Sequence, residues 1–208
     1  EGIEEIDYPI ESEKDTLSEY LNHIDNEIVL SMSTAKKIDT KKDKGGQDYD
    51  QFIYLNNIGM AKEHQEFLYN LCKEKKIDYL IVLAIIKHER KFNSQNISKT
   101  GDYGYMQINK GNHKHLAKTL NTPNKPLDPH INIKWGTYML DDLYVSWRKQ
   151  GISDKTKEGE VFSKLDRYVL SSYNKGVAGF KKYGEATKYI KRVEQEYLYL
   201  KNLINKAK

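Results

Sequence analysis

The sequence predicts a mostly α-helical fold. Apolar residues recur every three or four positions along several segments, and residues that favour helix starts precede two of these segments. The apolar run at 80–86 suits a helix that is buried nearly all round. A Gly-rich segment at 98–109 interrupts the helices, and we expect it to form a short irregular turn or hairpin.

The chain divides into two unequal parts, an acidic segment at 1–50 and a main domain at 51–208. Residues 1–49 hold 13 acidic and 6 basic side chains, so the remainder must be strongly basic to give the chain its net charge of +4. A stripe of apolar residues predicts an amphipathic helix over about 13–38, which packs on the main domain or binds a partner protein. Residues 39–50 lack apolar anchors and read as a linker. The stripe consists of Leu17, Leu21, Ile24, Ile28, Met32 and Ala35.

Five helices are expected in the main domain, because apolar residues return there with helical spacing. The second is expected to begin after Asp78 and the third after Asp128, since Asp is a favoured N-cap residue. Pro129 suits the first turn of that third helix. The expected helices span about 60–76, 79–91, 129–150, 160–173 and 185–205.

Glu89 is the first candidate functional residue. It follows the apolar run at 80–86 and leaves the predicted buried helix where the core meets the surface. An acid that protonates a leaving group near neutral pH must be partly desolvated, because burial keeps a carboxyl protonated. The position therefore suits a proton donor, and a solvated helix end is the alternative reading.

Several motifs follow Glu89 in a fixed order. Asp102-Tyr103-Gly104-Tyr105-Met106-Gln107-Ile108-Asn109 resembles the Gly-Leu-Met-Gln segment of soluble lytic transglycosylases, in the Asp-Tyr-Gly form of conjugation and secretion-system transglycosylases and of animal lysozymes. Leu127-Asp128-Pro129, Asn132-Ile133 and Gly136 match the helix that follows in that family. Ser172-Tyr173-Asn174-Lys175-Gly176 resembles its Ala-Tyr-Asn-x-Gly motif, and Thr187-Lys188-Tyr189-Ile190 with Val193 resembles its Thr-x-x-Tyr-Val-x-x-Val element.

Over about 78–195 the chain thus resembles the lysozyme-like superfamily, in particular the soluble lytic transglycosylase (SLT) domain of the conjugation, secretion and phage-associated type. The resemblance implies a goose-type lysozyme-like fold with its cleft between the Glu89 helix and the later helices. It also implies that Glu89 is the catalytic acid and base. The family usually has Ser directly after this Glu, and Arg90 stands there instead, which puts fine positioning in doubt.

The resemblance also implies which residues bind substrate. Tyr173 and Tyr189 can hydrogen-bond Glu89 or the sugar, and the alternative for each is a core aromatic. Gln107 and Asn174 carry both donors and acceptors, which suits the N-acetyl and hydroxyl groups of a glycan. The expected substrate-binding residues are Gly104, Tyr105, Met106, Gln107, Tyr173, Asn174 and Tyr189.

Asp102 bears on the type of reaction. If its carboxyl lies about 5 Å from that of Glu89, Asp102 is a possible second carboxylate of a retaining hydrolase. If it points away, one acid remains, which fits a lytic transglycosylase. The alternative for Asp102 is a turn residue beside Gly101.

The spacing of the candidate residues does not support a metal site or a cysteine nucleophile. The segment from His88 to Phe92 begins like a zinc-protease helix, but Phe92 occupies the place of the second His. His113 and His115 lack a signalled third ligand and are expected to be surface histidines, so we expect neither a metal nor a cofactor. Cys72 lies on an apolar helical face and is expected to be a core residue.

Composition points to a place outside the cytoplasm. The basic residues of the main domain show no nucleic-acid motif, and their charge suits an anionic wall polymer. The chain shows neither a signal peptide nor a transmembrane run, and we expect a secreted or wall-associated protein whose export signal or anchor has been trimmed. With 30 Lys against 4 Arg, the usage resembles that of a low-GC Gram-positive bacterium.

The sequence therefore predicts a peptidoglycan lytic transglycosylase that cleaves between N-acetylmuramic acid and N-acetylglucosamine with Glu89 as its acid and base. A hydrolytic muramidase using Glu89 and Asp102 is the first alternative. The second is a non-catalytic glycan-binding subunit of a machine that spans the cell wall.

Overall fold

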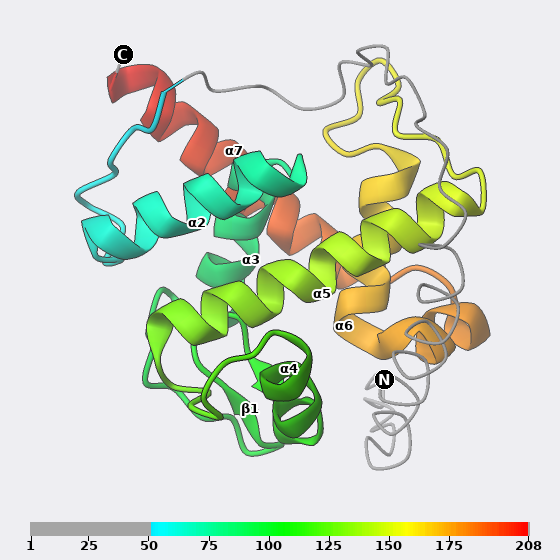
Figure 1. The fold of residues 1–208 in the computed structure, drawn as a ribbon. Helices are drawn as coiled ribbons and strands as arrows, with labels where there is room; N and C mark the ends of the chain where they lie inside the picture. The colour runs from blue at the N-terminus through cyan, green and yellow to red at the C-terminus, as the bar shows by residue number, and fades with distance from the viewer. Residues whose placement is uncertain (1–50, 208) are drawn as a thin grey trace, which may run out of the picture.

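A computed structural model describes residues 51–207 (Figure 1). The expected helix over 13–38 and the linker at 39–50 lie outside the described residues. Among the described residues, helices dominate and one small antiparallel hairpin is present, so the mostly α fold is confirmed. The helices are α2 (Lys62–Lys75), α3 (Tyr79–Arg90), α4 (His113–Thr119), α5 (Pro129–Lys149), α6 (Lys164–Tyr183) and α7 (Thr187–Ala207); the hairpin joins β1 (Asp102–Tyr103) to β2 (Ile108–Asn109), and the 3-10 turn η1 covers Lys110–Asn112.

The helix α3 lies at the centre of the core. Its residues 80–86 are all buried, as the apolar run predicted. α3 packs against α7, and α5 packs against both α2 and α6. In Figure 1, α5 crosses in front of α3, and the hairpin lies beneath the beginning of α5. The end of α3 that carries Glu89 is therefore held within a shell of other elements.

The caps predicted from the sequence are confirmed at two helices. The Asp78 side chain accepts a hydrogen bond from the Leu80 N–H at 2.8 Å and so caps α3. The Asp128 side chain accepts from two N–H groups of the first turn of α5, where Pro129 stands at the beginning. Each carboxylate satisfies donors that have no partner within their own helix.

The boundaries expected for α6 were wrong at both ends. The helix begins at Lys164 instead of 160, because Ser163 and Asp166 form a reciprocal capping box. It runs past 173 to Tyr183, although Gly176 adopts φ 72° and ψ 158° and kinks it. The end comes at Gly184, which is the C-cap residue.

The helix α4 was missed in the sequence. It has seven residues, and among them only His113 and Leu116 are buried. A segment this short shows no complete period of an apolar stripe, so pattern analysis had little to detect.

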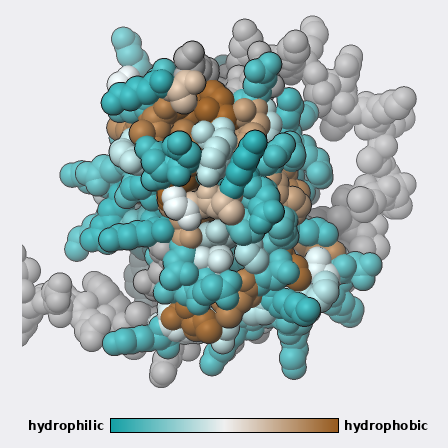
Figure 2. All heavy atoms as spheres, turned by 90° about the vertical axis from the view of Figure 1, so that its left-hand side faces the viewer, coloured by the Kyte–Doolittle hydropathy of each residue, from teal (hydrophilic) through white to brown (hydrophobic). Residues whose placement is uncertain are grey.

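The molecular surface is largely polar. Figure 2 shows one face covered mostly by hydrophilic side chains, with apolar patches above and below. No helix within the described residues combines the length and the apolar character needed to cross a membrane.

Candidate active site

Glu89 is the penultimate residue of α3 and is half-buried. The hydroxyl of Tyr189, in the first turn of α7, donates a hydrogen bond to Glu89 Oε1 at 3.1 Å. Burial, reinforced by the negative charge of Glu89, raises the pKa of Tyr189 well above its usual value. Tyr189 therefore keeps its proton and remains a donor to the Glu89 carboxyl over the whole physiological range.

Tyr173 makes a different hydrogen bond from Tyr189. Its hydroxyl donates to the carbonyl oxygen of Met106 at 2.8 Å, which ties α6 to the turn of the hairpin. Burial raises the pKa of Tyr173, and the charges of Glu89 and Asp102 raise it further. The half-buried Tyr173 is thus close enough to be influenced by both candidate carboxylates.

Asp102 is held by donors close to it in the chain and across the hairpin. Ser98 Oγ and Thr100 Oγ1, in the turn before β1, donate to its Oδ2 at 2.8 Å and 2.5 Å. Asn109, its register partner across the hairpin, donates from Nδ2 to Oδ1 at 2.9 Å. The Asp102 carboxylate therefore organises the local chain, because its two oxygens accept hydrogen bonds from the turn before β1 and from β2.

A buried amide joins the turn of the hairpin to α5. Asn132 donates from Nδ2 to the carbonyls of Tyr103 at 2.8 Å and Pro126 at 2.9 Å, and its Oδ1 accepts from the Met106 N–H at 2.8 Å. A Cβ at Gly104, whose φ is +73°, would lie 2.5 Å from Asn132 Nδ2. Position 104 therefore requires glycine for its backbone angle and for space.

Met106 anchors the same turn from the other side. Its side chain is fully buried, and a Cβ added at Gly136 of α5 would collide with its sulfur. The Met106 side chain is thus a packing element, and the atoms that it offers to the site are those of its main chain. Asn132 and Gly136 match the family pattern in the sequence. Their structural roles became apparent only from the way α5 packs against the hairpin turn.

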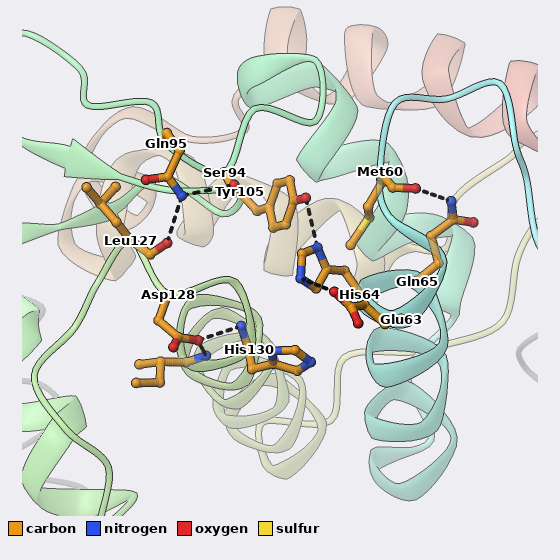
Figure 3. Close-up of polar contacts among 11 residues, drawn as sticks. Met60, Glu63, His64, Gln65, Ser94, Gln95, Tyr105, Leu127, Asp128 and His130 are labelled. Atoms are coloured by element: carbon orange, nitrogen blue, oxygen red, sulfur yellow. Dashed lines mark hydrogen bonds and ion pairs between the residues drawn. The ribbon is translucent and has the colours of Figure 1, made fainter.

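The other predicted hairpin residues point in different directions. Gln107 adopts φ 46°, and its Nε2 donates to the Gly104 carbonyl at 2.8 Å, which closes the turn. Tyr105 is buried and its hydroxyl lies 3.1 Å from His64 Nδ1 of α2 (Figure 3). Asn174, in contrast, is exposed on α6.

The contact between Tyr105 and His64 was missed in the sequence, because it joins residues 41 positions apart. His64 also packs against His130 at the beginning of α5, with ring centroids 5.1 Å apart (Figure 3). Burial lowers the pKa of His64, and His130 lowers it further. These rings connect α2 and α5 to the hairpin segment.

His113 is not the surface residue that was expected. It is 7% exposed, and its Nε2 lies 3.0 Å from the Ile108 carbonyl oxygen, so the ring packs under the hairpin. Burial lowers its pKa. Cys72 is a core residue as predicted, and burial raises the pKa of its thiol. No group of three or more His, Cys, Asp or Glu side chains suited to a metal ion occurs in the part of the chain that the structure describes.

A cavity of about 530 Å³ lies at the opposite end of α3. Asp78, Tyr144, Asp166 and Tyr197 are among its lining residues, and Glu89 is not. The Tyr197 hydroxyl donates to Asp78 Oδ2 at 3.1 Å and the Tyr144 hydroxyl to Asp166 Oδ1 at 2.8 Å. These two tyrosines bond the carboxylates that cap α3 and α6, and the residues that line the cavity do not include Glu89.

Comparison with known proteins assigns the family. The family described as "Transglycosylase SLT domain" matches residues 68–196, and the chain belongs to it. The lysozyme-like fold and the enzyme class predicted from the motifs, a lytic transglycosylase of peptidoglycan, are those of this family.

Two solved structures show a more distant likeness. An inactive mutant of the lytic transglycosylase Slt from Pseudomonas aeruginosa is 17% identical, with a TM-score of 0.48, over 77% of this chain and 25% of that one. The 70 kDa soluble lytic transglycosylase from Escherichia coli is 22% identical, with a TM-score of 0.43, over 66% of this chain and 22% of that one. The chain thus spans about a quarter of their length, and the family match alone carries the assignment.

Proposed function

We propose that this domain cleaves the β-1,4 bond between N-acetylmuramic acid and N-acetylglucosamine in peptidoglycan by lytic transglycosylation. The observation that carries the proposal is the pairing of Glu89 with Tyr189 at the end of a buried helix. It lies inside the segment that matches the transglycosylase family.

In the first step, Glu89 in its acid form protonates the oxygen of the leaving N-acetylglucosamine while the bond from that oxygen to C1 breaks. In the second step, the Glu89 carboxylate takes the proton of the C6 hydroxyl of N-acetylmuramic acid, and the C6 oxygen bonds to C1. Glu89 ends in its starting protonation state, and water is not consumed. Tyr189 holds the carboxyl in place during both transfers, because it donates to Oε1.

We assign the glycan contacts to the residues predicted from the motifs. Gly104 allows the positive φ with which the turn presents its main chain to a sugar, and Gln107 and the exposed Asn174 offer polar side chains. Tyr105 and Met106 have buried side chains, so they contribute main-chain atoms. Tyr173 and Tyr189 line the site beside Glu89.

The muramidase alternative requires Asp102 to attack or stabilise C1. Three side-chain donors, two from the turn before β1 and one from β2, already hold the two oxygens of Asp102. A carboxylate held by this many donors is a weak nucleophile, because each hydrogen bond stabilises its charge. This network favours the transglycosylase over the hydrolase.

The substrate sets the location that we propose, outside the cytoplasm and against the cell wall. The positive charge that the sequence concentrates in 51–208 would attract anionic wall polymers. The acidic segment at 1–50 is proposed to bind a protein partner or the domain itself.

The test is digestion of purified peptidoglycan with the wild type, Glu89→Gln and Asp102→Asn, followed by mass spectrometry of the released muropeptides. We expect products lighter by one water than reducing muropeptides, released by the wild type and not by Glu89→Gln. Reducing N-acetylmuramic acid ends that disappear in Asp102→Asn would instead establish the muramidase. Glycan binding without cleavage, unchanged in Glu89→Gln, would establish the non-catalytic subunit.

A further inference from the structure

The residue before Glu89 also contacts Tyr189. The His88 ring packs edge-on against the Tyr189 ring, with centroids 5.2 Å apart and an interplanar angle of 74°. The hydroxyl at the far end of that same ring donates to Glu89 Oε1 at 3.1 Å. Two consecutive residues of α3 therefore hold the side chain of Tyr189. His88 packs against its ring, and Glu89 accepts a hydrogen bond from its hydroxyl.

We propose that His88 is a positioning residue that fixes the Tyr189 ring and, through it, the orientation of the Glu89 carboxyl. The catalytic consequence rests on the function proposed above, whereas the structural link between His88, Tyr189 and Glu89 does not. Edge-to-face ring pairs are favourable beyond the area that they bury, and they select one ring orientation. Because the Tyr189 hydroxyl lies on the ring axis, the tilt of the ring decides whether the hydroxyl reaches Oε1.

The surroundings of His88 keep its ring neutral. Burial and the charge of Arg192 lower its pKa, and Glu196 opposes them. Both charged residues come from α7, and Glu196 is itself engaged by the ammonium of Lys87 on α3. A neutral imidazole packs edge-on against a phenol without the desolvation cost of a charge. The lowered pKa thus suits His88 to packing against the Tyr189 ring.

The expected effect on the reaction is specific. Tyr189 stabilises the ionised form of Glu89 most, since a hydrogen bond to a charged acceptor is stronger than one to a neutral acceptor. In the proposed reaction, the first proton transfer generates that form. A loosened Tyr189 ring should therefore lower kcat and leave KM nearly unchanged.

The experiment compares His88→Ala, His88→Phe, Tyr189→Phe and the double variant His88→Ala/Tyr189→Phe. The substrate is soluble, uncrosslinked peptidoglycan strands, and the melting temperature of each variant is recorded. We expect His88→Ala to lower kcat about tenfold with KM within twofold. His88→Phe keeps a ring in place and should stay within twofold of the wild type. The double variant should be no slower than Tyr189→Phe, because His88 acts through Tyr189.

Wild-type kcat in His88→Ala would overturn the proposal, and so would effects of the two single changes that multiply in the double variant. A second readout does not depend on cleavage. The carboxyl of Glu89 is titrated by ¹³C NMR in the same four variants and identified by its absence in Glu89→Gln. The proposal expects His88→Ala and Tyr189→Phe to raise the Glu89 pKa by the same amount, and His88→Phe to leave it unchanged.

The two readouts separate the two hypotheses. If the wild type cleaves no peptidoglycan while the pKa of Glu89 moves as expected, the proposed function fails and the role of His88 stands. If cleavage is observed and the Glu89 pKa is the same in His88→Ala as in the wild type, the role of His88 is overturned and the function stands.

Discussion

The two ends of α3 carry the same arrangement for different purposes. Asp78 at the beginning and Glu89 near the end each accept a hydrogen bond at 3.1 Å from a tyrosine of α7, Tyr197 in one case and Tyr189 in the other. Asp78 also accepts from the Leu80 N–H, and it lies at the end of the helix where the backbone dipole favours a negative charge. Glu89 lies at the opposite end, where the dipole disfavours the ionised carboxyl.

If Glu89 has the role proposed above, one packed helix pair serves stability at one end and chemistry at the other. At the Asp78 end the backbone and the tyrosine both stabilise the carboxylate, which makes a cap. At the Glu89 end the tyrosine orients the carboxyl while the dipole works against its ionisation, which suits a group that must give up a proton and take it back. Substitutions at the two ends should therefore separate into effects on stability and effects on activity.

The largest effect is expected from Glu89→Gln. Removing the acid and base should lower the rate of peptidoglycan cleavage by about 10²- to 10⁴-fold. The melting temperature should change little, because glutamine keeps the size of the side chain and an acceptor for Tyr189. Release of anhydro-muropeptides and thermal unfolding are measured on the same preparation. Retained cleavage would remove Glu89 from the mechanism.

Asp78→Ala should give the opposite pattern. Loss of the cap of α3 should lower the free energy of unfolding by about 1–2 kcal/mol, while kcat of the remaining folded enzyme stays near the wild-type value. Urea unfolding monitored by circular dichroism provides the measurement. Asp78→Asn is the matched control, since asparagine retains the capping oxygen. A large loss of kcat in Asp78→Ala would show that the two ends are coupled.

The two tyrosines offer a smaller and sharper contrast. Tyr197→Phe should destabilise the fold by about 1 kcal/mol and leave kcat unchanged. Tyr189→Phe should lower kcat about tenfold, with a similar or smaller loss of stability. Steady-state kinetics and urea unfolding of both variants test this contrast. It is contradicted if both substitutions change mainly kcat, or if both change mainly the free energy of unfolding.

The smallest effect concerns pH. Burial, the largest influence, raises the pKa of Asp78 above its usual value of 3.8 in the folded protein. The folded state then binds this proton more tightly than the unfolded chain does, so the contribution of Asp78 to stability falls as pH rises from about 3.8 to the raised pKa. Asp78→Asn should flatten this part of the curve of unfolding free energy against pH. An unchanged slope in Asp78→Asn would show that other groups cause the pH dependence of the unfolding free energy.

Local signals in the sequence predicted much of α3 and of α5. The apolar run at 80–86 located the central helix, and Asp78 and Asp128 marked helix starts, because capping depends on residues only two or three positions apart. The capping box at Ser163 and Asp166 is also a local signal, and it places the start of α6 later than the apolar spacing predicts. The continuation of α6 past Gly176 with a kink depends on tertiary packing, which the apolar spacing does not reveal.

The site was predictable in its residues more than in its contacts. Glu89 and Tyr189 were singled out by position in the motifs, and the structure brings them together. Tyr173 instead bonds to the main chain of Met106, a distinction that depends on how α6 docks against the hairpin. Of the three donors around Asp102, Asn109 depends on the register of the hairpin, which the sequence did not specify.

The separation of Glu89 and Tyr189 along the chain has a consequence for biosynthesis. The two residues lie 100 positions apart. A ribosome that adds about 5–20 residues per second reaches Tyr189 roughly 5–20 s after Glu89. Until α7 has been made and has docked, Glu89 lacks its tyrosine donor. A partly synthesised chain therefore carries the Glu89 carboxyl without the hydroxyl that orients it in the finished fold.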